Sequence, residues 1–274
     1  MTGERGDGVR APPLQTADDI WGELRRSTPA RIGLPRSGAS LATMALLQFQ
    51  LAHARARDAV VAPFDHAKLA ADLGGPGVPV IAASSAAQDR QAHLMRPDLG
   101  RRLAFDAAAA LAAQAGDYDV VFVVTDGLSA DAVSRHAPPV VASAIAALRK
   151  DGWRIAPVVI VRHGRVAVGD AVASALGAAS AVVLLGERPG LSAPDSMGAY
   201  LTWHPHARAT DADRNCISNI RAEGIGHEAA AYKIVHLLRA MRARGVSGVQ
   251  LKYDTERLLD ESRIDVERLP APRA

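Results

Sequence analysis

The chain has 274 residues, of which 49% are hydrophobic and 22% charged, a composition typical of a soluble globular protein with one large domain or two smaller ones. Its formal charge is only +3 and its lysines and arginines are scattered, which argues against a nucleic-acid partner. The single cysteine excludes an internal disulfide and a zinc site built from cysteines. The longest uncharged apolar stretch, residues 171–186, is too short to span a bilayer, so we expect no membrane partner.

The first part of the chain is predicted to be helical. Thr16 can cap a helix over residues 17–26, and the apolar spacing predicts a longer helix over residues 39–57. A third helix is expected over residues 64–73, where two glycines follow and can end it. We therefore predict a small helical N-terminal domain over residues 14–75.

Two turns in this region carry arginines whose roles the sequence leaves open. Arg31 and Arg36 bracket a turn in ARIGLPRSG, where they can bind an anion, bind a partner's carboxylate, or simply be solvated. Residues 76–101 are expected to form an irregular connector, in which VPVIAASS can be a short strand or an extended arm. The charged residues of RPDLGR, at positions 96–101, can likewise bind an anion or pair with one another.

From residue 102 the pattern becomes regular, because apolar strands alternate with amphipathic helices. Strands are predicted over residues 118–125, 156–162, 179–185 and 198–204. Helices are predicted over residues 102–115, 138–150, 170–176 and 227–244. Such alternation indicates a parallel sheet covered by helices on both faces. The predicted fold class is α/β: a Rossmann-like, mostly parallel sheet with flanking helices over residues 102–253, preceded by the small helical N-terminal domain.

The two ends of the chain are expected to contribute little to packing. Residues 1–13 contain no apolar core of the signal-peptide type and are interpreted as a flexible lead-in. Residues 254–274 are rich in charge and are interpreted as a C-terminal tail.

Polar loops follow three of the predicted strands, and ligands of open parallel sheets bind beyond such strand ends. The loops begin with Thr-Asp-Gly at 125–127, His-Gly-Arg at 163–165 and Gly-Glu-Arg at 186–188. Pro189 and Gly190 suit a tight turn that would hold Glu187 in place, whereas the alternative is a surface salt bridge between Glu187 and Arg188. The sequence contains neither G-x-G-x-x-G nor G-x-x-x-x-G-K-[ST], which weakens the case for a free-standing nucleotide enzyme.

The only cysteine, Cys216, lies in DRNCISN, within a polar segment that we interpret as irregular. As a nucleophile it would need a base, for which His204, His206 and His227 are candidates. A lone cysteine is more often a small packing residue. His204 and His206 can also clip a metal ion, but the sequence indicates no third ligand, so we predict no metal site.

Several motifs together resemble one family, the small (light) subunit of ethanolamine ammonia-lyase. The most specific are LLGERPGL at 184–191 and ADRNCISNI at 212–220. TDGLSA, RVAVGDAV, RPDLGR and ARIGLPRSG also occur, all in family order, so the resemblance covers nearly the whole chain. The histidines of WHPH are not part of the family pattern, so no function is carried onto them.

The resemblance implies an adenosylcobalamin-dependent enzyme that converts ethanolamine into acetaldehyde and ammonia by radical chemistry. The small subunit would be inactive alone and would bind cobalamin at its interface with a barrel-type large subunit, in a higher oligomer of heterodimers. The family's cobalamin contacts map onto Val166, Glu187 and Cys216. The complex would be cytoplasmic, either free or inside a bacterial microcompartment. The alternatives are a stand-alone α/β enzyme that uses Cys216 as its nucleophile and a non-catalytic adaptor.

Overall fold

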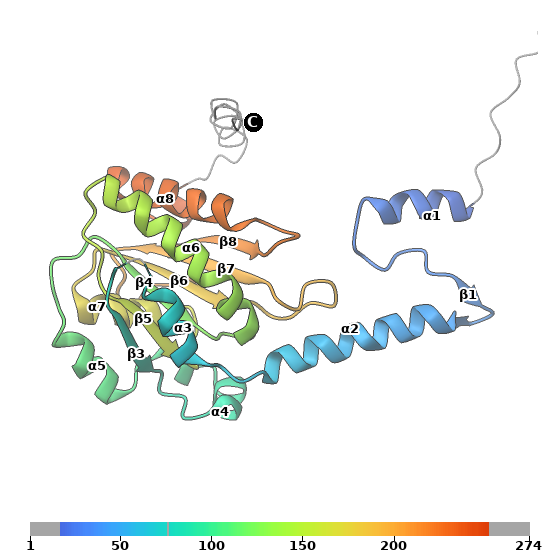
Figure 1. Cartoon of the computed structure of the whole chain (residues 1–274), viewed down its shortest axis with the longest axis horizontal. Coiled ribbons are helices and arrows are strands. Elements are labelled where there is room, and N and C mark those ends of the chain that lie inside the picture. Colours follow the sequence, from blue (N-terminus) through green and yellow to red (C-terminus); the bar gives the residue numbers. More distant parts are fainter. Residues whose placement is uncertain (1–16, 76, 252–274) are drawn as a thin grey trace, which may run out of the picture. The chain divides into compact units, whose positions relative to one another are not determined.

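The computed structural model describes residues 17–75 and 77–251, so the predicted lead-in and the predicted C-terminal tail lie outside the described residues. The chain divides into two compact units, Met1–Arg55 and Ala56–Ala274 (Figure 1). Each unit is described by itself, and the strand-end loops discussed above all belong to the second.

Unit 1 contains two helices and a short hairpin. Helix α1 spans Ala17–Arg26, as predicted. Strands β1 (Arg36–Ser37) and β2 (Ser40–Leu41) pair antiparallel around Gly38, whose φ of 62° belongs to the left-handed region. Helix α2 spans Thr43–Val61 and therefore begins later than predicted, because the hairpin takes up the residues in front of it.

Most of the large apolar side chains of these two helices are exposed. Ile20, Trp21 and Leu24 form the predicted apolar face of α1, and each keeps more than a third of its surface accessible. Met44 and Leu47 of α2 are more exposed still. Unit 1 is thus held by local contacts, such as the hydrogen bond that the Arg25 side chain donates to the carbonyl of Gly33.

Unit 2 is built on a six-stranded sheet in the order β3-β5-β4-β6-β7-β8 (Figure 1). Its strands are β3 (Val80–Ser84), β4 (Val121–Thr125), β5 (Val158–Arg162), β6 (Ser180–Gly186), β7 (Met197–Trp203) and β8 (Arg214–Ile220). Neighbours from β3 to β6 pair in parallel, whereas β7 is antiparallel to both β6 and β8. The mostly parallel sheet is therefore confirmed, and an antiparallel pair extends it.

The irregular interpretation of DRNCISN is wrong, because this motif forms strand β8. Only Arg214, Ile217 and Ile220 of the strand are buried, so its polar and apolar residues do not alternate strictly. The β7–β8 register also shifts between Met197 and Ala199. An edge strand with an irregular register and one exposed face lacks the period-2 signal on which a sequence prediction depends.

The helices of unit 2 agree with the prediction where the apolar period is strong. They are α3 (His66–Leu73), α4 (Arg90–Met95), α5 (Phe105–Ala112), α6 (Ala130–Lys150), α7 (Val168–Leu176) and α8 (His227–Arg244). Short 3-10 turns are η1 (Leu99–Arg101), η2 (Asp211–Asp213) and η3 (Gly248–Gln250). Helix α6 begins well before the predicted start at residue 138, because Ser129 caps it at its N-terminus. Pro138 and Pro139, which the prediction placed at the helix start, lie inside the helix.

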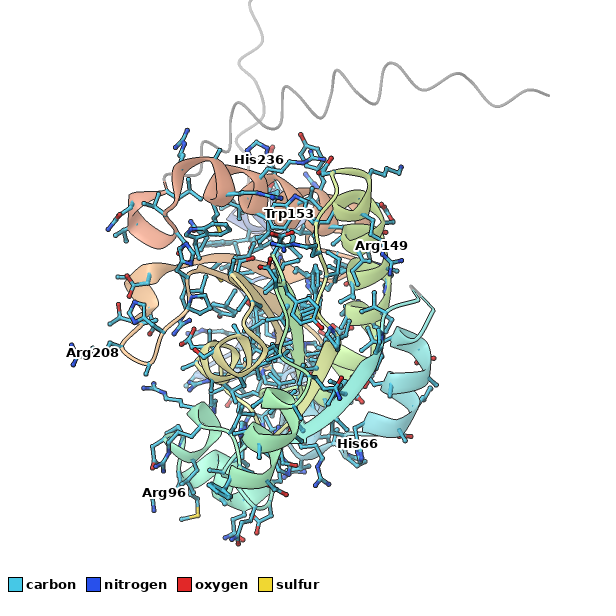
Figure 2. The ribbon with its side chains drawn as sticks, turned by 90° about the vertical axis from the view of Figure 1, so that its left-hand side faces the viewer. His66, Arg96, Arg149, Trp153, Arg208 and His236 are labelled. Atoms are coloured by element: carbon cyan, nitrogen blue, oxygen red, sulfur yellow. The ribbon has the colours of Figure 1, made fainter. Side chains whose placement is uncertain are left out.

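Helices cover both faces of the sheet, as the alternation of strands and helices predicts. On one face, Phe122 and Val124 of β4 pack in a core with α3, α6 and α8. On the other, Val121 and Val123 pack with α5 and α7. Trp153, just after α6, is buried in the first core and has the Arg242 guanidinium of α8 4.9 Å from its ring (Figure 2). Among the described residues, no helix is long and apolar enough to cross a membrane.

Candidate functional site

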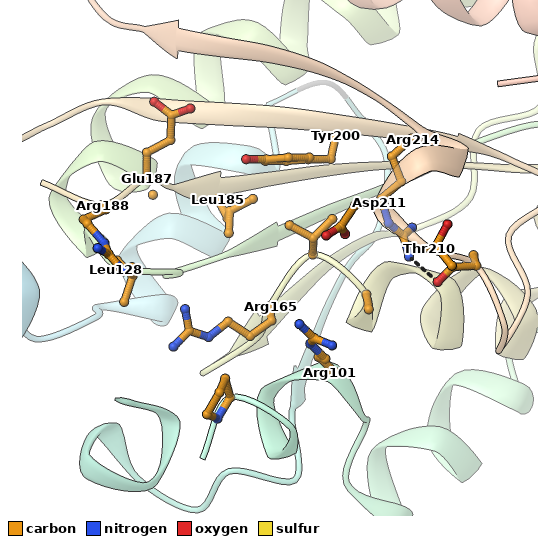
Figure 3. Close-up of a pocket in the computed structure, with 15 residues that line it drawn as sticks. Arg101, Leu128, Arg165, Leu185, Glu187, Arg188, Tyr200, Thr210, Asp211 and Arg214 are labelled. Carbon is orange, nitrogen blue, oxygen red and sulfur yellow. Dashed lines mark hydrogen bonds between the residues drawn. The ribbon is translucent and has the colours of Figure 1, made fainter. Parts of the chain in front are cut away.

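A pocket of about 590 Å³ lies beyond the carboxyl ends of β4, β5 and β6 (Figure 3). Its lining comes from the loops after these three strands, from η1, from β7 and from the segment that leads into β8. The sheet order β5-β4-β6 places the three parallel strands side by side, so their following loops meet at one edge. The predicted crevice is therefore confirmed as a pocket.

Glycines allow the loops after β4 and β6 to approach through their backbones. The amide of Leu128 donates to the carbonyl of Gly186 at 2.8 Å. A Cβ atom on Gly186 would collide with the backbone of Ser129, and one on Gly127 would collide with Gly186. Gly127 also has a φ of 52°, which few other residues adopt. The close approach of these two strand ends thus depends on the absence of side chains.

Asp126 ties the loops after β4 and β5 together. Its carboxylate accepts a hydrogen bond from the His163 backbone amide at 2.7 Å and from Arg90 Nη1 at 2.9 Å. Burial alone would raise the pKa of Asp126, but hydrogen bonding from His163 and the charge of Arg90 outweigh it and bring the pKa below its ordinary value. His93 adds to this arrangement, because its ring nitrogens lie 2.8 and 2.9 Å from the carbonyl oxygens of His163 and Gly127.

Glu187, just after β6, is held by three hydrogen bonds, two from β8 and one from the residue before β7. Its Oε1 accepts from Ser218 Oγ at 2.6 Å, and its Oε2 accepts from the Asn219 amide at 3.2 Å and from the Ser196 hydroxyl. The alternative of a salt bridge with Arg188 is wrong, since the carboxylate faces these donors instead. A carboxylate oxygen has about two acceptor positions, so Oε1 keeps one for a ligand.

Cys216 lies beside the pocket and not in its lining. It occupies β8, where its Cα partner on β7 is Tyr200, a residue that does line the pocket. Cys216 is exposed at the surface of β8, but the protein around its thiol removes part of the water and raises its pKa, although a hydrogen bond from Tyr200 acts in the opposite direction. A thiol with a raised pKa is a poor nucleophile at neutral pH, which disfavours the stand-alone cysteine enzyme.

The remaining predicted residues separate clearly. Val166 lines the pocket from the loop between β5 and α7, as Glu187 does from the end of β6. His204 and His206 are exposed on the loop after β7. Among the residues that the structure describes, no group of three or more His, Cys, Asp or Glu could hold a metal ion.

The sequence analysis placed Arg165 and Arg188 in the strand-end loops and left RPDLGR open as an anion site, but it did not predict that Arg101 and Arg214 join them around one pocket. Arg101, from RPDLGR, lines it, while Arg96 of the same motif is at the periphery (Figure 2) and forms two hydrogen bonds with Asp98 at 2.8 and 2.9 Å. Arg214 also lines it and forms a buried ion pair with Asp170, with two contacts of 2.6 and 2.7 Å. Asp170 is far away in the sequence, so no local spacing signals this pair.

A six-stranded Rossmann-like sheet with a pocket at its parallel strand ends defines an α/β ligand-binding domain. A family model described as "Ethanolamine ammonia-lyase light chain (EutC)" matches residues 18–252. The chain therefore belongs to the ethanolamine ammonia-lyase light-chain family.

Similar proteins include three that carry the name "Ethanolamine ammonia-lyase small subunit". The protein of Ralstonia nicotianae is 50% identical over 260 residues, which cover 93% of this chain and 95% of that protein. One from Pseudomonas fluorescens is 52% identical over 240 residues, covering 86% and 88%. That of Azotobacter vinelandii is 50% identical over 243 residues, covering 87% and 90%. The likeness thus extends over most of both chains in each case.

Proposed function

We propose that this chain, as the small subunit of an ethanolamine ammonia-lyase, forms one wall of an adenosylcobalamin site that it shares with a large subunit. Membership of the light-chain family supports the enzyme, and the name of its relatives implies a large partner subunit. In this proposal the partner is barrel-type, the complex is a higher oligomer of heterodimers, and its place is the cytoplasm, free or inside a microcompartment.

The observation that carries the proposal is the convergence of the family-matched residues on one pocket. Val166 and Glu187 line it, and Cys216 contacts it through Tyr200. A pocket of about 590 Å³ is of a size that takes a drug-sized molecule. A corrinoid is larger, so only part of it would enter this chain, and the remainder would lie against the partner.

The side chains of the pocket suit a ligand with many amides and hydroxyls. Glu187 Oε1 can accept from an amide or a ribose hydroxyl, and Val166 gives an apolar contact. The buried Arg165 Nε has no hydrogen-bond partner among the described residues and can donate. When bound, adenosylcobalamin supplies the radical chemistry through its cobalt–carbon bond. The residues of this chain would bind and orient the cofactor. Glu187, held by its three hydrogen bonds, would position the ligand without a change in its own conformation.

The test compares two glutamates in the complex reconstituted with a large subunit. Glu187→Gln should weaken adenosylcobalamin binding about tenfold, because it removes a charge-assisted hydrogen bond from the ligand. Glu228→Gln is the matched control, since Glu228 also accepts from a serine hydroxyl, that of Ser143 at 2.9 Å, but lies outside the pocket lining. Equilibrium dialysis measures both affinities. Unchanged affinity in a variant that combines Glu187→Ala with Cys216→Ala would contradict the proposal.

Enzymatic activity gives an independent check. The chain alone should show no turnover of ethanolamine, and turnover should appear only when the large subunit and adenosylcobalamin are both added. Turnover by the chain alone, abolished by alkylation of Cys216, would instead favour the stand-alone enzyme.

A further inference from the structure

Three arginines of the pocket have no acidic partner. Arg101, Arg165 and Arg188 all line it, and among the described residues none of them forms an ion pair within 4.0 Å. Figure 3 shows Arg101 and Arg165 on the side of the pocket opposite Tyr200 and Asp211. Arg188 lies beside Glu187 in the same view, and the charges of Arg101 and Arg188 both act on Arg165. These three residues, the arginine wall, thus gather positive charge around Arg165.

Arg165 is held in place without having its charge neutralised. Its Nη2 donates to the carbonyl of His93 at 3.0 Å, and its backbone amide donates to the carbonyl of Gly100 at 2.7 Å. A Cβ atom on Gly100 would lie only 2.8 Å from Arg165 Cγ, so the glycine permits this close contact. The Nε of Arg165 is buried and has no partner among the described residues. A buried donor without an acceptor is unfavourable, and a ligand oxygen would relieve it.

Three positive charges and one negative charge act on Arg165. Burial lowers the pKa of Arg165, and the positive charges of Arg90, Arg101 and Arg188 lower it further. Asp126 is the one acid that acts in the opposite direction, but its oxygens already accept from Arg90 and His163. Bringing like charges together around a pocket costs free energy, which an anion bound between them would recover.

The two acids of the pocket lining, Glu187 and Asp211, form no ion pair with these arginines. Glu187 is bonded to Ser196, Ser218 and Asn219 at the end of β6. Asp211 comes from the segment before β8, on the opposite side of the pocket (Figure 3). An anion at the arginine wall would therefore meet guanidinium groups first.

We propose that Arg101, Arg165 and Arg188 form a phosphate-binding subsite, which takes the phosphodiester of the cobalamin nucleotide tail. Guanidinium groups present planar sets of N–H donors that match phosphate oxygens, and several together bind phosphate tightly. The proposal rests on the proposed function, because the phosphodiester reaches this wall only if the corrinoid enters the pocket. Phosphate binding is the shared chemistry, and its other source would be free phosphate.

The main experiment compares two corrinoids, one with and one without the phosphate. Cyanocobalamin carries the nucleotide tail, whereas dicyanocobinamide lacks both the nucleotide and its phosphodiester. Their dissociation constants are measured by equilibrium dialysis on the complex of the full chain with the large subunit. Arg101→Gln combined with Arg188→Gln should weaken cyanocobalamin binding about tenfold and leave dicyanocobinamide binding unchanged. Both side chains are exposed, so the variant is expected to fold.

Arg102→Gln is the matched control. Arg102 is exposed and adjacent in sequence to Arg101, but it is outside the pocket lining and lies 3.7 Å from Asp98. Its substitution should leave both dissociation constants unchanged. Equal weakening of the two corrinoids by the double variant, or no weakening of either, would overturn the phosphate subsite while leaving cobalamin binding itself intact. If neither corrinoid binds the unsubstituted complex, the proposed function fails, and the tail assignment fails with it.

Inorganic phosphate separates the two sources. It should compete with cyanocobalamin but not with dicyanocobinamide, and the competition should disappear in the double variant. Phosphate that binds the unsubstituted complex without competing with cyanocobalamin would show a site for free phosphate and would overturn the assignment to the nucleotide tail.

Discussion

Two arginines of the same pocket, Arg214 and Arg165, are used in opposite ways. Arg214 is almost fully buried, and its two terminal nitrogens contact the two oxygens of Asp170. Arg165 is partly buried, and its only side-chain hydrogen bond to a described residue goes to the neutral carbonyl of His93. Both leave a buried Nε without a partner, so the difference between them lies in the counter-charge.

The difference separates residues that hold the fold from residues that are available to a ligand. The Arg214–Asp170 pair joins β8 to the first turn of α7. Its charges cancel, so it has little left to offer a ligand. The Arg165 charge is uncompensated, and the free energy spent in holding it can be recovered only by something that binds. Counter-charge, more than position in the pocket, therefore distinguishes the two roles.

The largest expected effect comes from breaking the compensated pair. Asp170→Ala leaves the Arg214 charge buried and alone, which should lower the free energy of unfolding by about 3–5 kcal/mol. Urea unfolding followed by circular dichroism measures it. Asp98→Ala is the control, because it removes an equally bidentate partner from Arg96 on the surface and should leave the unfolding midpoint unchanged. An equal loss of unfolding free energy in Asp170→Ala and Asp98→Ala would show that the buried ion pair stabilises the fold no more than the exposed one.

A second test asks whether Asp126, whose charge also reaches Arg165, is committed to Arg90 and His163. Its pKa in the folded chain lies below the ordinary value of 3.8, so its carboxylate stabilises the fold above that value. This contribution should be lost as the pH falls through the lower, folded pKa. Asp126→Asn should lower the free energy of unfolding by about 1–3 kcal/mol near neutral pH, because the N–H donors of Arg90 and His163 lose a charged acceptor.

The measurement is the free energy of unfolding against pH for the original chain and for Asp126→Asn. The two curves should be separate near neutral pH and converge in acid, where the carboxyl group of the original chain is protonated. Parallel curves at every pH would mean that Asp126 contributes no charge-dependent stability and remains free to compensate Arg165.

Much of the fold could be predicted, because its signals are local. The strands β4, β5 and β6 are continuous apolar runs, and α8 has a strong helical period with Gly245 as its stop. The start of α6 could not be predicted, since two prolines in a row normally mark a helix start and here lie inside the helix. Strand β8 could not be predicted either, because its ordering comes from pairing with β7.

The candidate site divides in the same way. Val166 and Glu187 were predicted from family motifs and the loops that carry them from the rule for strand ends, and both residues line the pocket. The loops that carry Arg165 and Arg188 were predicted, but their meeting with Arg101 was not, because Arg165 contacts Gly100 and His93 across a long stretch of chain. The bonds that hold Glu187 also come from Ser218 and Asn219, on a strand that the sequence did not reveal. Contacts between distant segments therefore account for what the sequence missed.

The smallest expected effect concerns the acidic side of the pocket, where Cys216 responds to Tyr200 and Glu187. Partial desolvation of the exposed Cys216 raises the pKa of its thiol most, the hydrogen bond from Tyr200 lowers it, and the negative charge of Glu187 raises it. Tyr200→Phe removes the lowering influence, so alkylation by iodoacetamide at about pH 8 should become slower. Glu187→Gln removes a raising influence, so alkylation should become faster. Because Cys216 is the only cysteine, the rate is read directly by mass spectrometry of the whole chain.

The opposite signs make this test specific to electrostatics. A general loosening of the pocket would expose the thiol and speed alkylation in both variants, whereas the contacts described here require one rate to fall. Faster alkylation of Tyr200→Phe would therefore show that the hydroxyl shields the sulfur instead of stabilising the thiolate. If Glu187→Gln also fails to speed the reaction, the negative charge of Glu187 has no effect on the pKa of the Cys216 thiol. Faster alkylation of Glu187→Gln together with slower alkylation of Tyr200→Phe would instead show that Glu187, Tyr200 and Cys216 form one electrostatically coupled group at the pocket.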